Sequence, residues 1–119
     1  MIDLKNLTIK KAHQAFVAKE FSPRDLVLAY LDTIEKKDSE IGAYREVFKE
    51  GALKQADEAT KAFEEGRAGL LTGIPIAVKD NILIKGHVAG ASSKMLEQFV
   101  APYDATAIAK LKQAGAIFL

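Results

Sequence analysis

The sequence predicts an α/β fold in which helices come first and a sheet covered on both sides follows. Three observations carry this prediction: helical periodicity fills about the first 66 residues, an apolar run occupies residues 74–79, and a second apolar run at residues 116–119 follows another helical pattern. Strand, helix and strand in this order favour a parallel sheet in which the two runs are neighbours. We expect one domain, with a helical region over about residues 1–66 and the start of the sheet over about residues 67–119.

The first expected helix begins after Thr8, whose hydroxyl can accept a hydrogen bond from the first turn. Ile9, Ala12 and Phe16 then recur at the spacing that brings side chains to one face of a helix. Lysines and a glutamine fall mostly on the other faces. The pattern predicts an amphipathic helix that packs on a core through its apolar face.

The second expected helix has a stronger start, Ser22-Pro23-Arg24-Asp25. This start combines a capping hydroxyl with a proline at the first helical position and a carboxylate that can reach back to the N-cap amide. The apolar stripe that follows consists of Leu26, Val27, Tyr30, Leu31 and Ile34. We expect the helix to end at Lys36 and Lys37, whose charge suits a helix C-terminus, with a loop at residues 38–40.

A third helix is predicted over about residues 50–65, after a short strand or extended segment at residues 43–48. Its apolar face consists of Ala52, Ala56, Ala59 and Phe63. Glu50 with Lys54 and Asp57 with Lys61 are expected to form exposed pairs four residues apart. Gly66 ends the helix.

The sheet region begins after a glycine-punctuated loop, with an interior strand at residues 74–79. Residues 80–93 are irregular and rich in small side chains, and Ser93 can cap a short helix through Phe99. Asp104 is expected to cap another helix, which Gly115 stops, before the strand at residues 116–119. Because no turn signal follows that apolar run, we expect the chain to be truncated within a strand.

Composition and charge exclude several classes of function. Seventeen basic and sixteen acidic residues give a formal net charge of +1, so no strong field gathers nucleic acid or anionic lipid. No run of about 18 apolar residues and no signal pattern occurs, which favours a cytoplasmic protein without a membrane span. Without cysteines, and with His13 and His87 far apart in the sequence, we expect no metal site. The glycines match no nucleotide-binding motif.

Lys79 is the main candidate for chemistry, because it follows the apolar residues of an expected buried strand. At the carboxyl end of a parallel strand, a desolvated lysine can lose its proton and act as a general base. The alternative is that the strand ends at Val78 and Lys79 points into water beside Asp80, as most lysines do. The residues by themselves leave both interpretations open.

Ser92, Ser93 and His87 are weaker candidates. The serines have the residue type of a nucleophile, but no histidine or second lysine stands at a motif spacing, and paired serines before a helix are usually caps. His87 lies in the irregular segment and is interpreted as a loop residue, since a catalytic histidine needs a partner to place it.

Residues 71–82, LTGIPIAVKDNI, resemble the opening segment of the amidase signature family. Four further stretches resemble, within that family, the A subunits of the tRNA-dependent amidotransferases that act on Glu-tRNA(Gln) and Asp-tRNA(Asn): LTIKKA at 7–12, FSPRDL at 21–26, SKML at 93–96 and VAPYDAT at 100–106. The resemblance covers essentially the whole chain. It implies the N-terminal part of the amidase signature fold, a mixed sheet covered by helices on both faces.

The resemblance also implies an activity and a role for Lys79. In the family this lysine belongs to a triad with two serines, one held by a cis peptide bond, and both serines would lie beyond residue 119. A serine attacks the amide of glutamine, and Lys79 relays protons through the second serine. The 119 residues alone are therefore expected to be inactive.

The implied partners are the B and C subunits of a heterotrimer, with tRNA held mainly by a partner subunit. ATP and Mg²⁺ are expected to be used by that partner, and no cofactor is expected in this chain. Two alternatives stay open: a free-standing amidase that hydrolyses another amide, and a non-catalytic fragment or interaction module. One departure from the family is that Ala89 and Gly90 stand where many members have two threonines.

Overall fold

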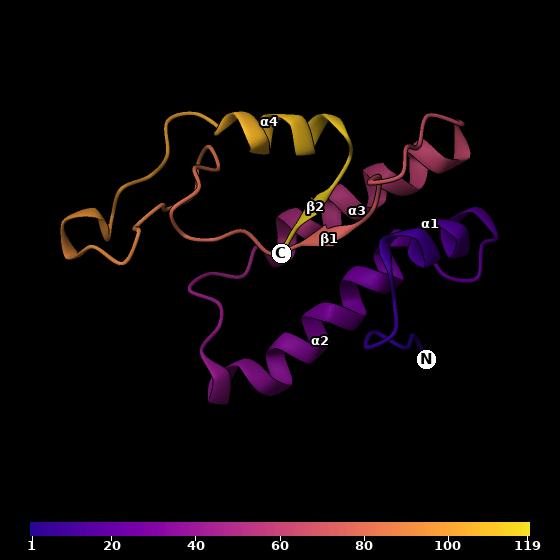
Figure 1. Ribbon diagram of the computed structural model, residues 1–119, viewed down its shortest axis with the longest axis horizontal. Helices are drawn as coiled ribbons and strands as arrows, with labels where there is room; N and C mark the ends of the chain where they lie inside the picture. Colours follow the sequence, from indigo (N-terminus) through magenta and orange to yellow (C-terminus); the bar gives the residue numbers. More distant parts are fainter.

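The computed structural model describes residues 1–119 and contains four α-helices, one short 3-10 helix and two short strands. Their bounds are α1 Ile9–Val17, α2 Pro23–Ile41, α3 Lys49–Glu64, β1 Pro75–Ile76, η1 Lys94–Leu96, α4 Thr106–Gln113 and β2 Ile117–Phe118. Figure 1 shows α2 and α3 running along one side of the strand pair and α4 lying on the other. No helix is long and apolar enough to cross a membrane.

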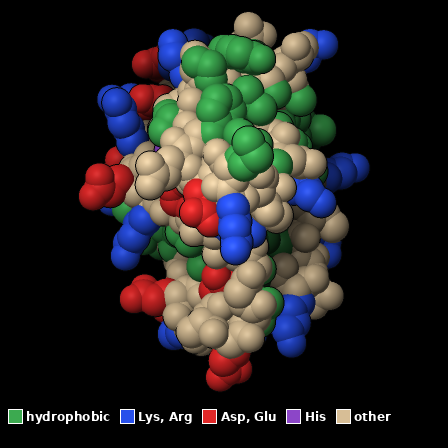
Figure 2. Space-filling view, turned by 90° about the vertical axis from the view of Figure 1, so that its left-hand side faces the viewer, with side chains coloured by type: hydrophobic (Ala, Val, Ile, Leu, Met, Phe, Trp, Pro, Cys, Tyr) green, Lys and Arg blue, Asp and Glu red, His purple; other side chains and the backbone are tan.

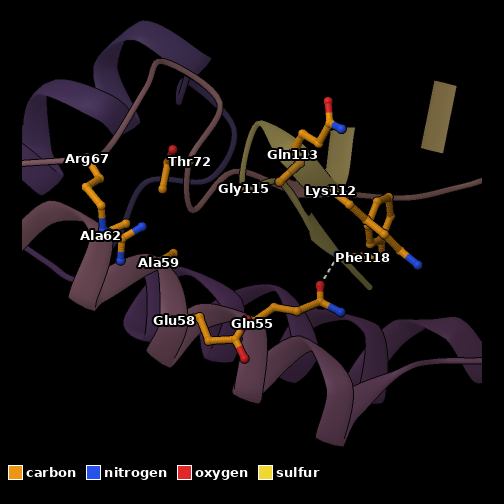
Figure 3. A pocket seen from close by; sticks show the side chains of 11 residues that line it. Gln55, Glu58, Ala59, Ala62, Arg67, Thr72, Lys112, Gln113, Gly115 and Phe118 are labelled. Carbon is orange, nitrogen blue, oxygen red and sulfur yellow. Dashed lines mark hydrogen bonds between the residues drawn. The ribbon is translucent and has the colours of Figure 1, made fainter. Parts of the chain in front are cut away.

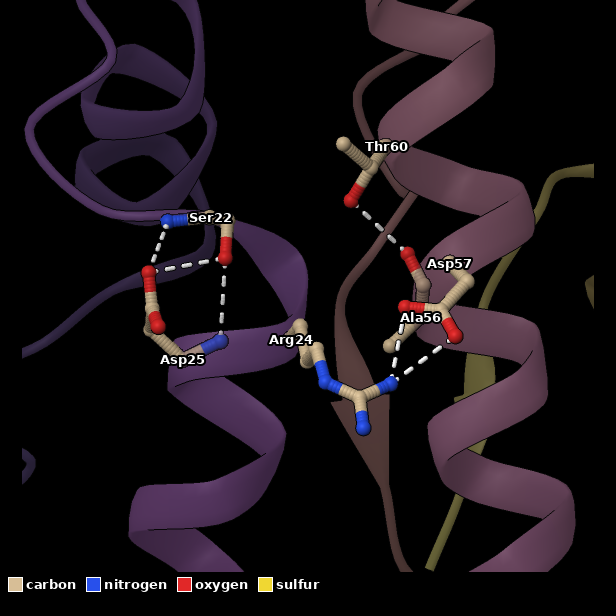
Figure 4. A network of polar contacts seen from close by, with 6 residues as sticks. All are labelled: Ser22, Arg24, Asp25, Ala56, Asp57 and Thr60. Carbon is tan, nitrogen blue, oxygen red and sulfur yellow. Dashed lines mark hydrogen bonds and ion pairs between the residues drawn. The ribbon is translucent and has the colours of Figure 1, made fainter.

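Both predicted helix starts are confirmed. The Lys11 amide donates to Thr8 Oγ1 at 3.2 Å, which caps α1. At α2 the Asp25 amide donates to Ser22 Oγ at 3.1 Å while the Ser22 amide donates to Asp25 Oδ2 at 2.8 Å (Figure 4). The bond from the Ser22 amide, and after it the bond that the Ser22 hydroxyl donates to Asp25 Oδ2 at 2.7 Å, hold the pKa of Asp25 below its usual 3.8. The expected packing of Ile9 is wrong, since its side chain is exposed.

The second helix runs one turn further than the sequence predicts. Lys36 does not end α2; it pairs with Asp32 at 2.7 Å on the helix surface. Gly42, at φ +65°, ends the helix after Ile41, and its amide donates to the Asp38 carbonyl. The Asp38 carboxylate accepts from the Ala43 amide at 2.7 Å, so this residue fixes the end of the helix from within its last turn and does not open a loop.

The third helix packs on the second through small side chains. Ala52, Ala56 and Ala59 are buried and share one apolar cluster with Val27 and Leu31 of α2. Alanines on this face allow the two helices to approach closely, so both can lie against the same side of the strand pair.

An ion pair joins the exposed edges of the same two helices. Arg24 Nη1 of α2 lies 2.8 Å from both carboxylate oxygens of Asp57 of α3 (Figure 4). The expected pairing of Asp57 with Lys61 is therefore wrong, and Glu50 forms no ion pair with Lys54. The carboxylate of Asp57 thus joins two helices through residues that are 33 positions apart in sequence.

The two apolar runs form a parallel pair, as predicted, with Pro75 opposite Ile117 and Ile76 opposite Phe118. The Ile117 amide donates to the Ile74 carbonyl at 2.9 Å, and the Leu119 amide donates to the Ile76 carbonyl at 3.0 Å. Each strand is only two residues long, shorter than the sequence predicts. The Phe118 amide points to the outer edge of β2, where it donates to Gln55 Oε1 of α3 at 2.9 Å (Figure 3).

Helices cover both faces of this strand pair, which confirms the expected α/β fold. Because side chains alternate along a strand, Ile117 and Leu119 enter the cluster formed by α2 and α3, while Phe118 packs with Ile108 of α4. A third cluster holds Ile74 against α1 and the start of α2. The core therefore lies on both sides of β2.

The expected cap of α4 is wrong. Ala105 occupies the N-cap position without a side-chain hydrogen bond. Asp104 instead accepts from the Lys85 amide at 2.8 Å and from Lys112 Nζ at 2.9 Å. The hydrogen bond from Lys112, and to a smaller extent the bond from the Lys85 amide, holds the pKa of Asp104 below its usual 3.8. The carboxylate thus fastens the loop before η1 to the last turn of α4.

Candidate functional site

Lys79 follows β1 by three residues, and its backbone is well fixed. Its carbonyl accepts from the Ile82 amide at 3.0 Å, and the carbonyl of the next residue, Asp80, accepts from the Ala91 amide at 3.2 Å. The side chain is exposed in these 119 residues, as in the second of the two interpretations that the sequence left open. The sheet has only two strands of two residues each, and although Val78 still packs on the cluster of Ile108 and Phe118, no strand lies beside Lys79 itself.

The side chain of Lys79 nevertheless lines a cavity of about 450 Å³. Its walls are formed by residues 43–48 before α3, residues 77–80 after β1, the loop from Ile82 to Ser92, and Leu119 after β2. Small-molecule sites commonly have volumes of this order. An exposed lysine beside a cavity therefore has room near it for a substrate or for additional protein.

Charged and polar side chains pair across the walls of this cavity. Arg45 Nε lies 3.7 Å from Asp80 Oδ2, and Arg45 Nη2 donates to Ser92 Oγ at 3.3 Å. His87 Nδ1 lies 3.8 Å from Glu46 Oε1. All three contacts join residues 43–48 to segments that follow β1.

Neither His87 nor the two serines form a catalytic group with their neighbours. The imidazole of His87 packs against Phe48 with ring centroids 3.9 Å apart and the rings tilted by 39°, in keeping with its interpretation as a loop residue. Ser92 Oγ accepts from a guanidinium, which cannot take its proton. Ser93 stands at the N-cap position of η1 but makes no side-chain capping bond, and the helix it precedes is shorter than predicted.

Tyr44 adds a phenol to the cavity wall. Burial raises the pKa of Tyr44 above its usual 10.0, and the charge of Asp38 raises it further. The phenol therefore stays protonated at neutral pH and offers a hydrogen-bond donor, not a base.

The segment without the two threonines is held by its backbone. The Ala89 amide donates to the Phe99 carbonyl at 3.0 Å, and the Ser93 amide donates to the Gly90 carbonyl at 2.9 Å. Between these bonds, Ala91 and Ser92 both have positive φ, 47° and 58°. The loop therefore keeps an ordered turn without threonine hydroxyls.

Sequence reasoning missed Arg45 and Glu46 as residues of this site. Both lie in a segment expected only to be extended, and their partners lie far along the chain, 47 residues away for Arg45 and Ser92. No local motif could have indicated such contacts. No group of three or more histidine, aspartate or glutamate side chains is arranged to hold a metal ion.

The segment that follows this loop exposes apolar side chains. Met95, Leu96, Phe99, Val100 and Tyr103 are all exposed, Met95 almost completely. Figure 2 views the molecule from this end and shows hydrophobic side chains gathered in its upper part, between acidic and basic ones. Contiguous apolar surface of this kind is typical of a region that other protein covers.

Comparisons with known proteins agree with this architecture. The family model described as Amidase matches residues 25–119. The chain is 44% identical over 118 residues to the A subunit of the glutamyl-tRNA(Gln) amidotransferase of Ruminiclostridium cellulolyticum, covering 99% of this chain and 24% of that protein. It is 45% identical over 116 residues to the protein of the same name from Desulfatibacillum aliphaticivorans, covering 98% and 24%.

Solved structures show the same fold. The native peptide amidase from Stenotrophomonas maltophilia superposes with a TM-score of 0.83 at 29% identity, covering 98% of this chain and 24% of that one. An amidase family protein from Bacillus anthracis superposes with a TM-score of 0.87 at 25% identity, covering 96% and 23%. The fold is thus that of an α/β amidase domain. The chain belongs to the amidase family, as the resemblance of residues 71–82 indicates, and it spans about a quarter of the length of the curated relatives it matches.

Proposed function

We propose that this chain is the N-terminal part of a glutaminase subunit of a tRNA-dependent amidotransferase. The subunit would hydrolyse glutamine and supply ammonia to convert Glu-tRNA(Gln), Asp-tRNA(Asn) or both to the amidated tRNA. The observation that carries the proposal is 44–45% identity over nearly the whole chain to proteins named as the A subunit of glutamyl-tRNA(Gln) amidotransferase. The cavity beside Lys79 is consistent with it.

Lys79 is the catalytic residue that this chain would contribute. A serine Oγ from beyond residue 119 attacks the amide carbon of glutamine, and its proton passes through a second serine to the neutral amine of Lys79. When the carbon–nitrogen bond breaks, the proton returns to the leaving ammonia. Water then hydrolyses the acyl-enzyme to glutamate, and the free serine is restored.

This role requires the amine of Lys79 to be neutral for part of the cycle. In the 119 residues the side chain is exposed, so the desolvation that favours a neutral amine must come from protein that closes over the cavity. The exposed apolar segment beyond the loop supports such a covering. We propose that the remainder of the enzyme packs at this end of the domain.

The proposed partners are the B and C subunits of the amidotransferase. A partner subunit would hold most of the tRNA and use ATP and Mg²⁺ to activate the carboxylate that receives the ammonia. No cofactor is proposed for this chain, and the complex is proposed to act in the cytoplasm.

A free-standing amidase is the second candidate. The similarity to the Stenotrophomonas protein favours it, because the same fold occurs there in a protein named as a peptide amidase. Transfer of ammonia to Glu-tRNA in the presence of ATP and partner subunits would distinguish the amidotransferase from this candidate. Turnover of simple amides without partners would support the free-standing amidase.

The test of the proposed role is Lys79→Ala in the full-length enzyme. We expect glutaminase activity to be lost while the far-UV circular dichroism spectrum is unchanged. Lys85→Ala is the matched control, since Lys85 is an exposed lysine that does not line the cavity. Near-normal glutaminase activity of Lys79→Ala would refute the assignment, as would turnover by the isolated 119 residues.

A further inference from the structure

A strained turn lies against the segment that carries Lys79. The Ser93 amide donates to the Gly90 carbonyl and closes a tight turn whose two central residues, Ala91 and Ser92, both have positive φ. The left-handed region costs a residue with a Cβ atom about 1–2 kcal/mol. Such strain persists only where the surroundings hold it, and strained residues cluster at functional sites.

A backbone bond and the side chain of Arg45 hold this turn against Asp80, beyond the end of β1. The Ala91 amide donates to the Asp80 carbonyl at 3.2 Å, and Arg45 Nη2 donates to Ser92 Oγ at 3.3 Å. Arg45 Nε also lies 3.7 Å from Asp80 Oδ2. Among the hydrogen bonds and ion pairs of the structure, Arg45 is the only side chain that contacts both the turn and Asp80.

The position of Lys79 depends on this arrangement because its own side chain has no partner. Its amine makes no hydrogen bond or ion pair, so its place depends on its segment, which is held by the backbone bonds of Lys79 to Ile82 and of Asp80 to Ala91 and by the contact of Asp80 with Arg45. A shift of the turn therefore moves the Asp80 carbonyl and, with it, the Cα atom from which the Lys79 side chain extends.

We propose that Arg45 is a positioning residue that sets the place of Lys79 for catalysis, acting through Asp80 and the turn at residues 90–93. The inference rests on the proposed function, since it needs Lys79 to act as the base. Residues 43–48 thereby become part of the catalytic apparatus, although none of their side chains relays the proton.

The energetics separate this role from a role in folding. The Arg45 side chain is 64% exposed and that of Asp80 is 25% exposed, and pairs of this kind stabilise a protein by less than about 1 kcal/mol. Loss of the pair therefore leaves the fold intact. Misplacement of a catalytic group by about 1 Å, by contrast, can lower a rate about 100-fold.

The test is Arg45→Ala in the full-length enzyme, with kcat and KM for glutamine measured separately. We expect kcat to fall at least about tenfold while KM changes less than about threefold, because positioning of the base affects the chemical step more than substrate binding. Millimolar guanidinium is expected to restore part of the lost kcat, because the exposed site of the missing side chain is open to a free guanidinium ion.

Arg67→Ala is the matched control. Arg67 is similarly exposed, pairs only with Glu65, and lies away from the cavity of Lys79. We expect this variant to keep its kcat and to show no gain with guanidinium. Rescue by guanidinium distinguishes positioning from a structural role, since a destabilised fold would lose activity in the same solution.

The outcomes separate this inference from the proposed function. If Lys79→Ala is inactive and Arg45→Ala has a normal kcat, the positioning role is refuted and the proposed function stands. A loss of kcat that guanidinium does not restore also overturns the positioning role. If Lys79→Ala is active, both the proposed function and the inference that rests on it fail.

Discussion

Gly73, just before β1, is where a single methyl group should disturb the domain most. Its φ is +81°, and a Cβ atom built there would lie 2.9 Å from Cγ of Pro23 and 3.2 Å from Cε2 of Phe16. The proline ring cannot rotate away, because it forms the first residue of α2. The loop that leads into β1 therefore sits directly on the junction of α1 and α2.

Two destabilising contributions to the free energy of folding add up in Gly73→Ala. Positive φ costs an alanine about 1–2 kcal/mol. The contact with Pro23 and Phe16 adds about 1–3 kcal/mol, the usual cost of overpacking a well-packed core. Gly86→Ala isolates the first term, because Gly86 has nearly the same φ, +84°, and nothing lies within 4 Å of its Cβ position.

Thermal unfolding of the 119-residue chain, followed by far-UV circular dichroism, measures the difference. About 1 kcal/mol corresponds to about 4 °C in a chain of this size. We therefore expect Gly73→Ala to lower the Tm by about 4–12 °C more than Gly86→Ala does. Equal shifts in the two variants would refute the close approach of this loop to Pro23, and with it the way β1 is placed.

Two further predictions concern polar contacts. The bonds from Ser22 lower the pKa of Asp25 in the folded state, so the stabilisation by this carboxylate is fully present above its unfolded pKa and is lost as the pH falls through its folded pKa. In urea unfolding below about pH 4, the stability of the wild type should therefore approach that of Asp25→Asn. Gln55→Leu removes the acceptor of the Phe118 amide and should cost about 1–3 kcal/mol. Gln113→Leu, which removes no such bond, should stay within about 0.5 kcal/mol in the same assay. Equal urea midpoints for the two glutamine variants would contradict the edge contact.

Features that depend on a few adjacent residues could be predicted from the sequence. The cap of α2 is such a case: Ser22 and Asp25 exchange hydrogen bonds across three positions, and no distant residue is needed. The parallel pairing of the two apolar runs was also predictable, because the order of strand, helix and strand leaves few topologies open.

Features that depend on distant partners could not be predicted. Asp104 has the residue type of a cap, but its carboxylate accepts from the Lys85 amide and the Lys112 ammonium instead of from the first turn of α4. Asp57 is taken by Arg24 of another helix in the same way. A local pattern cannot weigh such contacts, because the competing donor is absent from the window that defines the pattern.

The candidate site shows both cases together. Lys79 could be singled out because an ammonium after a run of apolar residues is unusual. Whether its side chain is buried or exposed could not be decided from the sequence, since that depends on how many strands lie beside β1. Arg45 gave no signal at all, because its two contacts are made only after residues 43–48 have folded back toward the end of β1.

The amide of Gln55 stands where the backbone of a neighbouring strand would otherwise bond to β2. A side chain changes rotamer within nanoseconds, whereas a paired strand separates only when many bonds break together. The outer edge of β2 is therefore closed by a side chain that can change its rotamer, and not by a paired strand. A strand that joined this edge would therefore have to replace one side-chain hydrogen bond, that of Gln55, to pair with the Phe118 amide.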